Sequence, residues 1–165
     1  ITALKLLRKK PNYLVSCIMY SKKSIEGAQL IDENTSILDI VTEAKLPDGT
    51  IHQTFKVRGG SRFNTGKYGT NTCSGHRVFN KEKLSELRNI CEFSINDGYK
   101  FWTKAERSQS DIDAGVGKAT IIDGTGPYKN TKGAKCLYAI SFHEEIVFTN
   151  IKCSLDDQIF NELKK

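Results

Sequence analysis

The cysteines are the residues of this chain with the most specific covalent chemistry. They are Cys17, Cys73, Cys91, Cys136 and Cys153. Cys73 and Cys91 flank the polar, helix-prone insert 80–88, and Cys136 and Cys153 lie about equally far from an expected turn at residues 144–145. Each pair could therefore face across a hairpin, where a disulfide would close a loop of about 18 residues and contribute roughly 3 kcal/mol. Cys17 is then the odd one out.

Two other interpretations of the cysteines stay open beside the disulfides. A metal site needs ligands in tight clusters such as C-x2-C, and no two of these cysteines are that close. Unpaired buried thiols are the second alternative. We favour the disulfides, and we expect neither a metal nor a cofactor.

A basic, glycine-rich run at residues 56–63 has the composition of an anion-binding segment. Cationic side chains can neutralise phosphates, while Phe63 and Tyr68 could stack on bases. The candidate anion-binding residues are Arg58, Arg62, Lys67 and Arg77. A single Arg-Gly-Gly is weak evidence, and no complete RNA-binding signature accompanies it. We therefore expect a mobile inter-strand loop here, and nucleic-acid binding stays the less favoured alternative.

Polar residues among apolar strand neighbours are the candidates for catalysis. Glu92 lies between Cys91 and Phe93, so it is either an interior acid and weak catalytic candidate or an outward-facing residue. His76 and Arg77 on a cysteine-bounded strand are better placed to bind an anion than His143, which we expect in a solvated turn.

Aromatic residues in the second half of the chain are the candidates for holding a ligand. Either face of residues 99–106 could line an interior, and Trp102 could be a binding platform or a surface residue covered by lysine stems. The ligand-binding candidates are Phe93, Tyr99, Phe101, Trp102 and Tyr128.

The elements that must position these residues are mostly strands. Pro47-Asp48-Gly49 predicts a hairpin of residues 35–44 with 50–57, and Asn96-Asp97-Gly98 predicts a second of 90–95 with 99–106. Further strands are expected at 73–79, 118–123, 134–142 and 146–151.

The two ends of the chain differ from this β pattern. Residues 154–165 combine a capping-box variant with apolar residues at helical spacing, which predicts a short C-terminal α-helix. Residues 1–12 are an N-terminal extension, either a short basic helix or a frayed terminus. About eight strands without alternating helices predict an all-β fold, in which a single domain over residues 1–165 forms an antiparallel β-barrel. A sandwich is the alternative.

Composition limits the classes of protein further. The 25 Lys and Arg against 19 Asp and Glu give a net charge of +6, which favours anionic partners but is typical of a solvated basic surface. No stretch approaches the roughly 20 apolar residues of a membrane-spanning helix, so we expect a soluble protein. The chain begins at Ile1 without a methionine, and we expect that an upstream segment such as a signal peptide has been removed.

The segment IDGTGPYK at residues 122–129, followed by Lys132-Gly133, has glycines typical of tight corners and an aromatic plug at Tyr128. It resembles the GGTG-aromatic turn of the allene oxide cyclase and dirigent-like barrels and of small secreted bacterial barrels. The resemblance covers residues 90–149. Asp123 stands where the family often has glycine, and a second glycine is replaced around Asn130.

The resemblance implies an eight-stranded antiparallel barrel, often a dimer or trimer, whose interior binds a hydrophobic small molecule. It transfers no catalytic nucleophile. Our leading hypothesis is therefore a secreted or periplasmic barrel that binds a small, mostly apolar ligand, with a cytoplasmic location as the alternative. A second hypothesis is an isomerase or cyclase using the same cavity, and a third is an anion- or nucleic-acid-binding module.

Overall fold

Two glycine-containing turns close two of the hairpins, as predicted. Gly49, at φ +86°, closes the turn between β1 (Gln29–Lys45) and β2 (Thr50–Phe63), and its N–H donates to the Leu46 carbonyl at 3.0 Å. Gly98, at φ +87°, does the same between β4 (Lys83–Ile95) and β5 (Lys100–Arg107). Side chains other than glycine rarely adopt this conformation. Both predicted hairpins are confirmed.

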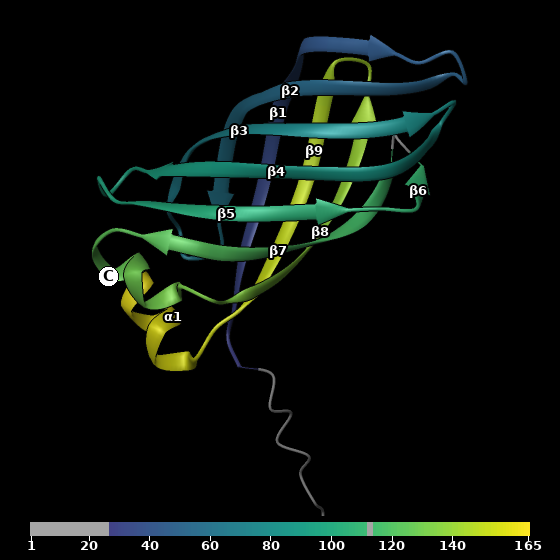
Figure 1. Ribbon diagram of the computed structural model, residues 1–165. Coiled ribbons are helices and arrows are strands. Elements are labelled where there is room, and N and C mark those ends of the chain that lie inside the picture. Colours follow the sequence, from purple (N-terminus) through teal and green to yellow (C-terminus); the bar gives the residue numbers. More distant parts are fainter. Residues whose placement is uncertain (1–26, 112–113) are drawn as a thin grey trace, which may run out of the picture.

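The computed structural model describes residues 27–111 and 114–165, which form a closed antiparallel barrel of eight strands (Figure 1). The strands follow one another around the barrel in chain order, and β9 pairs with β1 while β3 pairs with β4. The short β6 lies outside this circuit and pairs with the start of β4. The remaining elements are β3 (Tyr68–Asn80), β6 (Ser110–Asp111), β7 (Ala114–Gly124), the 3-10 helix η1 (Gly126–Thr131), β8 (Lys135–His143), β9 (Ile146–Ser154) and α1 (Asp157–Leu163).

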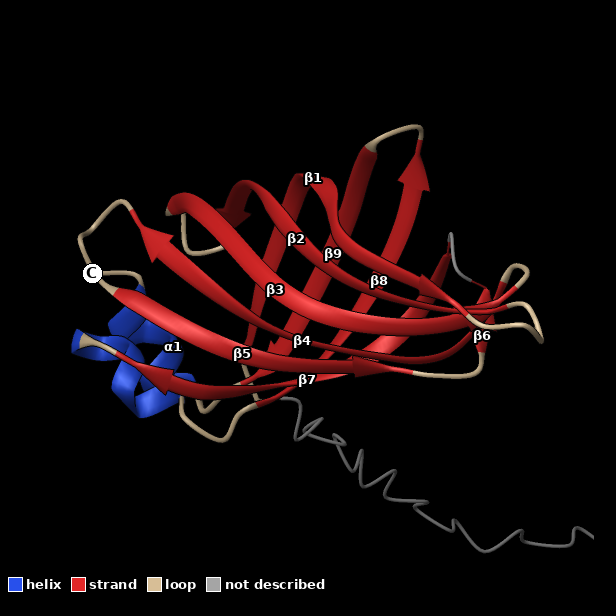
Figure 2. Cartoon of the chain, turned by 45° about the horizontal axis from the view of Figure 1, so that its top comes forward, coloured by secondary structure: helices blue, strands red, loops and turns tan. Residues whose placement is uncertain are grey.

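Strand stagger gives the barrel its tilted appearance. Following paired residues from Ile31 through β9, β8, β7, β5, β4, β3 and β2 leads back to β1 at Thr42 rather than at Ile31. A closed barrel requires such a shift together with tilted strands. Figure 2 shows β1, β8 and β9 crossing the other strands steeply, with α1 and η1 at one end of the barrel.

Two sequence predictions about the segments between β1 and β5 were wrong. The insert 80–88 is not helical, because it holds a tight turn with Lys81 at φ +54° and the first residues of β4. The basic run 56–63 is not a mobile loop, because it belongs to β2. The expected N-terminal helix and Cys17 lie outside the described residues.

Core residues alternate with outward-facing residues along the strands. The core divides into two clusters. The larger one fills the end of the barrel under α1 and contains an aromatic group with Tyr128, which is 2% exposed. The smaller one, at the opposite end, is Phe55, Phe79, Leu84 and Leu87. The predicted C-terminal helix is therefore confirmed, and Leu163 anchors it with no exposed surface.

Both predicted disulfides are present. Cys73 and Cys91 are directly opposed on β3 and β4, and Cys136 and Cys153 are directly opposed on β8 and β9. Disulfides persist mainly in oxidising compartments, so these bonds indicate an extracellular or periplasmic type of setting. No helix in the described part of the chain is long and apolar enough to cross a membrane.

Candidate functional site

The inward face of β1 is unusually polar for a barrel core. Strand alternation turns Asp32, Asn34 and Ser36 into the lumen, the interior space of the barrel, and each is 7% exposed or less. Buried polar groups cost free energy unless they form hydrogen bonds. This face of β1 therefore needs partners inside the barrel.

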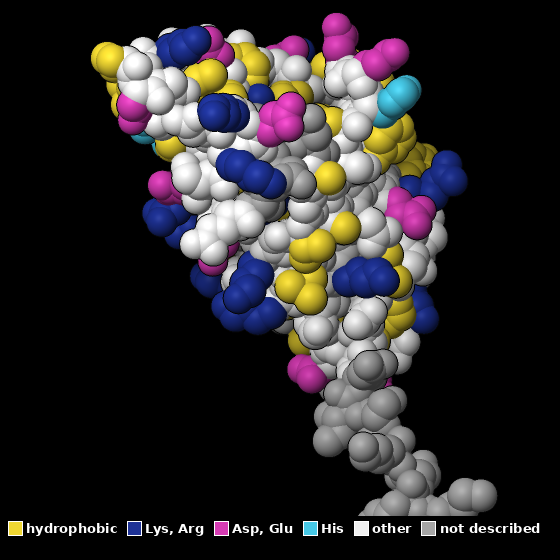
Figure 3. Space-filling model, turned by 90° about the vertical axis from the view of Figure 1, so that its right-hand side faces the viewer, with side chains coloured by type: hydrophobic (Ala, Val, Ile, Leu, Met, Phe, Trp, Pro, Cys, Tyr) yellow, Lys and Arg dark blue, Asp and Glu magenta, His cyan; other side chains and the backbone are white. Residues whose placement is uncertain are grey.

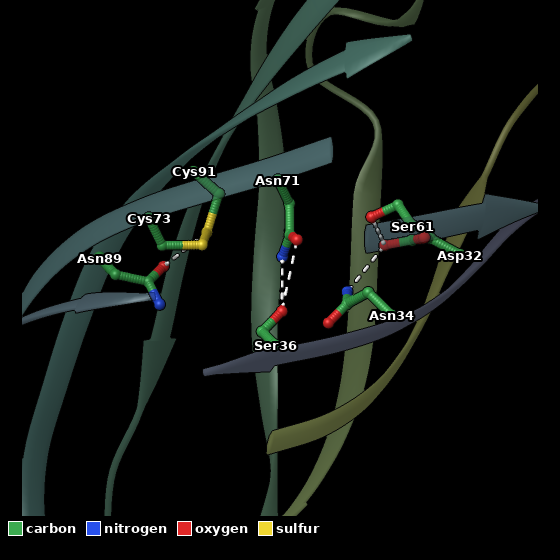
Figure 4. Close-up of a disulfide and its surroundings, with 8 residues drawn as sticks. All are labelled: Asp32, Asn34, Ser36, Ser61, Asn71, Cys73, Asn89 and Cys91. Atoms are coloured by element: carbon green, nitrogen blue, oxygen red, sulfur yellow. Dashed lines mark hydrogen bonds between the residues drawn. A yellow bond between two sulfur atoms is a disulfide. The ribbon is translucent and has the colours of Figure 1, made fainter. Parts of the chain in front are cut away.

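Those partners come from β1 itself and from two neighbouring strands (Figure 4). The Asn34 amide donates to Asp32 Oδ2 at 2.9 Å, and the Ser61 hydroxyl of β2 lies 3.4 Å from the same oxygen. Ser36 and Asn71 of β3 exchange hydrogen bonds at 3.3 and 3.2 Å. The result is a polar band that crosses three strands near the middle of the barrel.

Gly59 of β2 is what allows this band to form. It pairs with Ser36, and a Cβ at Gly59 would lie 2.2 Å from both the Ser36 hydroxyl and the Thr35 carbonyl oxygen. Any larger residue would push β1 away from β2. The Arg-Gly-Gly of the sequence thus has a structural role at its first glycine.

Asp32 is the one acid buried in the lumen among the described residues, and half of its carboxylate is unsatisfied. Its Oδ2 accepts the hydrogen bonds above, whereas Oδ1 has no partner within the described part of the chain. A small void of about 10 Å³ adjoins this carboxylate, with walls that include Phe63, Phe93 and Phe101. Burial among apolar groups disfavours the charged form and raises the pKa of Asp32 to about 6.

A second, larger cavity of about 60 Å³ lies in the middle of the lumen. It shares Phe93, Thr103 and Ile151 with the void beside Asp32, so the two are neighbours. Its walls combine apolar side chains and both cysteines of the first disulfide with the polar residues Asn34, Asn71, Asn89, Thr103 and Thr149. Such a volume holds about two water molecules or an organic fragment of similar size.

Tyr138 contributes a second buried polar atom without a partner. Its ring lies against β7 where Gly117 leaves room, because a Cβ at Gly117 would lie 2.3 Å from the ring. The hydroxyl forms no hydrogen bond within the described residues, and burial raises the pKa of Tyr138 to about 12. Tyr138 also lines the central cavity.

The five predicted ligand-binding aromatics do not form one site. Phe93, Phe101 and Tyr128 stack on one another at ring-centroid distances of 4.5 and 5.4 Å and close the helix-covered end of the barrel. Tyr99 is 42% exposed and covers Gly126, and Trp102 faces outward. Tyr128 belongs to η1, and its buried ring closes this end of the barrel as the predicted plug would.

Glu92 is not an interior acid. Cys91 and Phe93 point inward, so alternation places Glu92 on the outer face, where it accepts hydrogen bonds from Lys100 at 2.7 Å and Trp102 at 3.1 Å. The Lys100 ammonium beside it holds the pKa of Glu92 below its usual value. The buried carboxylate of the barrel is Asp32 instead.

The four predicted anion-binding residues do not converge. Arg58 pairs with Asp39 on the outer surface, and Lys67 pairs with Asp97 at a turn. Arg77 is buried, donates to Gln53 at 2.7 Å and lies over two aromatic rings. On the face shown in Figure 3, Lys and Arg side chains are spread among acidic and apolar ones rather than gathered in one patch.

Asp32, Asn34 and Ser36 were not predicted as site residues, because residues 32–36 are all polar and show no alternation that separates an inward from an outward face. The one signal was the spacing of two residues from the apolar Leu30, whose inward side these three residues share. The described residues contain no cluster of His, Cys, Asp and Glu arranged to hold a metal ion. Comparison with known proteins found no matching family model, curated protein or solved structure.

Proposed function

We propose that this barrel binds a small organic ligand in its lumen, with Asp32 as the polar anchor. The observation that carries the proposal is the unsatisfied Asp32 Oδ1 beside a small void, which neighbours the central cavity. A buried carboxylate without full hydrogen bonding is costly, and such groups concentrate at binding and catalytic sites. A ligand with an apolar body and one hydrogen-bond donor would satisfy the oxygen and fill the space.

The proposal includes an exported location and kinship with the allene oxide cyclase and dirigent-like barrels. The two disulfides support the exported location. The kinship rests on the sequence resemblance at residues 90–149, with which a closed antiparallel barrel is compatible. A cavity of about 60 Å³ is smaller than the usual drug-sized site, so the ligand is either small or enters with rearrangement of the walls.

An isomerase or cyclase is the second candidate. The observation that favours it is an acid with a pKa of about 6 next to an apolar cavity, because such a group can both accept and release a proton near neutral pH. A binding protein and an enzyme share the same site here. The distinction is whether a bound molecule leaves the lumen unchanged.

Native mass spectrometry of protein purified from its own source, without reductant, tests the proposal. We expect a molecule that is retained natively and lost on denaturation, and weaker retention by the Asp32→Asn variant than by the matched Asp39→Asn variant. Asp39 lies on the same strand but is exposed and paired with Arg58. Equal retention by both variants, or no retained molecule at all, would contradict lumenal binding through Asp32.

A matched pair of probes gives a second readout. Isobutylammonium carries donors on a small apolar body, whereas isobutyrate has the same body with an anionic head. We expect amide chemical shifts of the lumen strands to respond to the first probe only, and to lose that preference in Asp32→Asn. Responses confined to surface amides would count against the site.

A further inference from the structure

The outer surface of the barrel carries a groove much larger than the lumenal cavity. It is open to solvent, has a volume of about 830 Å³ and crosses five neighbouring strands, β3, β2, β1, β9 and β8. Binding sites for small molecules commonly enclose about 300–1,000 Å³. The groove is therefore of a size that holds a ligand of several rings.

Strand register explains the shape of the groove. Outward-facing residues form two rows across the strands, one of which is Tyr68, Arg62, Glu33, Asn150 and Ala139. The other row is Thr70, Gly60, Thr35, Phe148 and Ser141. Gly60 and the small side chains of these rows form the floor of the groove. The long and aromatic side chains of the rows form its sides.

Two aromatic rings on this surface are exposed to solvent. Tyr68 is 62% exposed and Phe148 is 45% exposed, and both line the groove. They lie three strands apart and in different rows, two residues apart along the strand direction, so their backbones are about 16 Å apart. Exposed rings at this spacing can stack on the apolar faces of sugar units in an oligosaccharide, and the stacking removes the rings from water.

The polar side chains of the groove are available to a ligand. Glu33 and Arg62 face each other across β1 and β2, yet within residues 27–111 and 114–165 neither side chain forms an ion pair or hydrogen bond, and Asn150 forms none either. Together they offer donors and acceptors for neighbouring hydroxyl groups. One acid beside one base leaves the groove without net charge, which favours a neutral ligand.

The other macromolecular ligands fit the groove less well. An extended peptide binds a sheet through a free edge, but the strands below the groove are paired on both sides. A nucleic acid needs several cations along its path. Arg62 is the single basic side chain among the described residues that line this groove.

From these observations we propose that the outer groove binds a neutral oligosaccharide. The chain lies along the strand-crossing rows, stacks on Tyr68 and Phe148, and exchanges hydrogen bonds with Glu33, Arg62 and Asn150. The proposal does not depend on the lumenal ligand, because the groove residues named here face outward.

The test is a titration of the full ¹⁵N-labelled protein with cellohexaose, maltohexaose and chitohexaose. We expect at least one of them to shift amide signals of β1, β2 and β9 around the groove. Tyr68→Ala and Phe148→Ala should each weaken its binding about tenfold. Val116→Ala is the matched control, because Val116 is 65% exposed and does not line the groove.

Gly60 allows a steric test that leaves the binding side chains in place. A Cβ there would meet open space, its nearest neighbour being the Gly69 carbonyl oxygen at 4.0 Å, so Gly60→Val should fold normally. Its side chain would fill the floor of the groove and abolish binding. Undiminished binding by a folded Gly60→Val protein would overturn the proposal, as would the absence of binding to all three hexasaccharides.

Discussion

Replacing Asp32 by Asn should remove a loss of stability that this carboxyl group causes as the pH rises from about 4 to about 8. Burial raises the pKa of Asp32 from 3.8 to about 6, so the folded protein holds this proton more tightly than the unfolded chain. Stability therefore falls as the pH rises through this window, and the full cost is present above about pH 7. One pKa unit corresponds to about 1.4 kcal/mol, so the total is about 3 kcal/mol.

Urea unfolding of the oxidised protein measures this effect directly. Between about pH 4 and pH 8, wild-type protein should lose about 2–3 kcal/mol of unfolding free energy relative to Asp32→Asn. Titration of the other carboxyl groups cancels in this difference. Asp39→Asn serves as the control, since it makes the same substitution on the same strand at a carboxylate that lies on the outer surface.

Two results would refute the reasoning about Asp32. Parallel pH profiles for wild type and Asp32→Asn would mean that the carboxylate is solvated in the folded protein. A wild-type protein that gains unfolding free energy relative to Asp32→Asn as the pH rises would mean that the folded state favours the charged form, and the lumen would then contain a cation or donor that satisfies Oδ1.

Substitutions at three further places test the framework around the site. Gly59→Ala should lower the unfolding free energy by about 1–3 kcal/mol in urea, because its Cβ would overlap β1, while Gly60→Ala should be nearly neutral; equal effects would disprove the close approach. Replacing Cys73 and Cys91 together by serine should cost about 3 kcal/mol by the same assay, and an unchanged unfolding midpoint would show that the bond does not form. Glu92→Gln should change stability by less than about 1 kcal/mol while altering tryptophan fluorescence, and a large loss of stability would indicate a buried role for this acid.

Local turn chemistry made much of the fold predictable. Asp48-Gly49 and Asp97-Gly98 each supply the residue types that a tight hairpin requires, and both hairpins formed as expected. The cysteine pairs were predictable for a related reason, because residues placed symmetrically about a hairpin turn become direct cross-strand neighbours.

The candidate site was less predictable, since its formation depends on contacts between distant segments. Gly59 and Gly60 weaken strand propensity, so the basic run resembled a loop, and only the approach of β1 explains the first glycine. Glu92 could have been placed correctly, because its neighbours Cys91 and Phe93 are apolar and alternation turns it away from them. To place Asp32 correctly, one would have had to infer that a row of polar residues faces inward, whereas for Glu92 a polar residue faces outward as usual.

The two candidate sites share β1, and its register decides both of them. Asp32 and Asn34 face the lumen, whereas Glu33 and Thr35 face the outer groove. A slip of one residue would exchange these faces and bury Glu33 in place of Asp32. Gly59 fits the observed register, because a Cβ at this position would overlap the Ser36 side chain. The glycine that weakens β2 as an isolated strand thus makes room for the polar row of β1 inside the barrel.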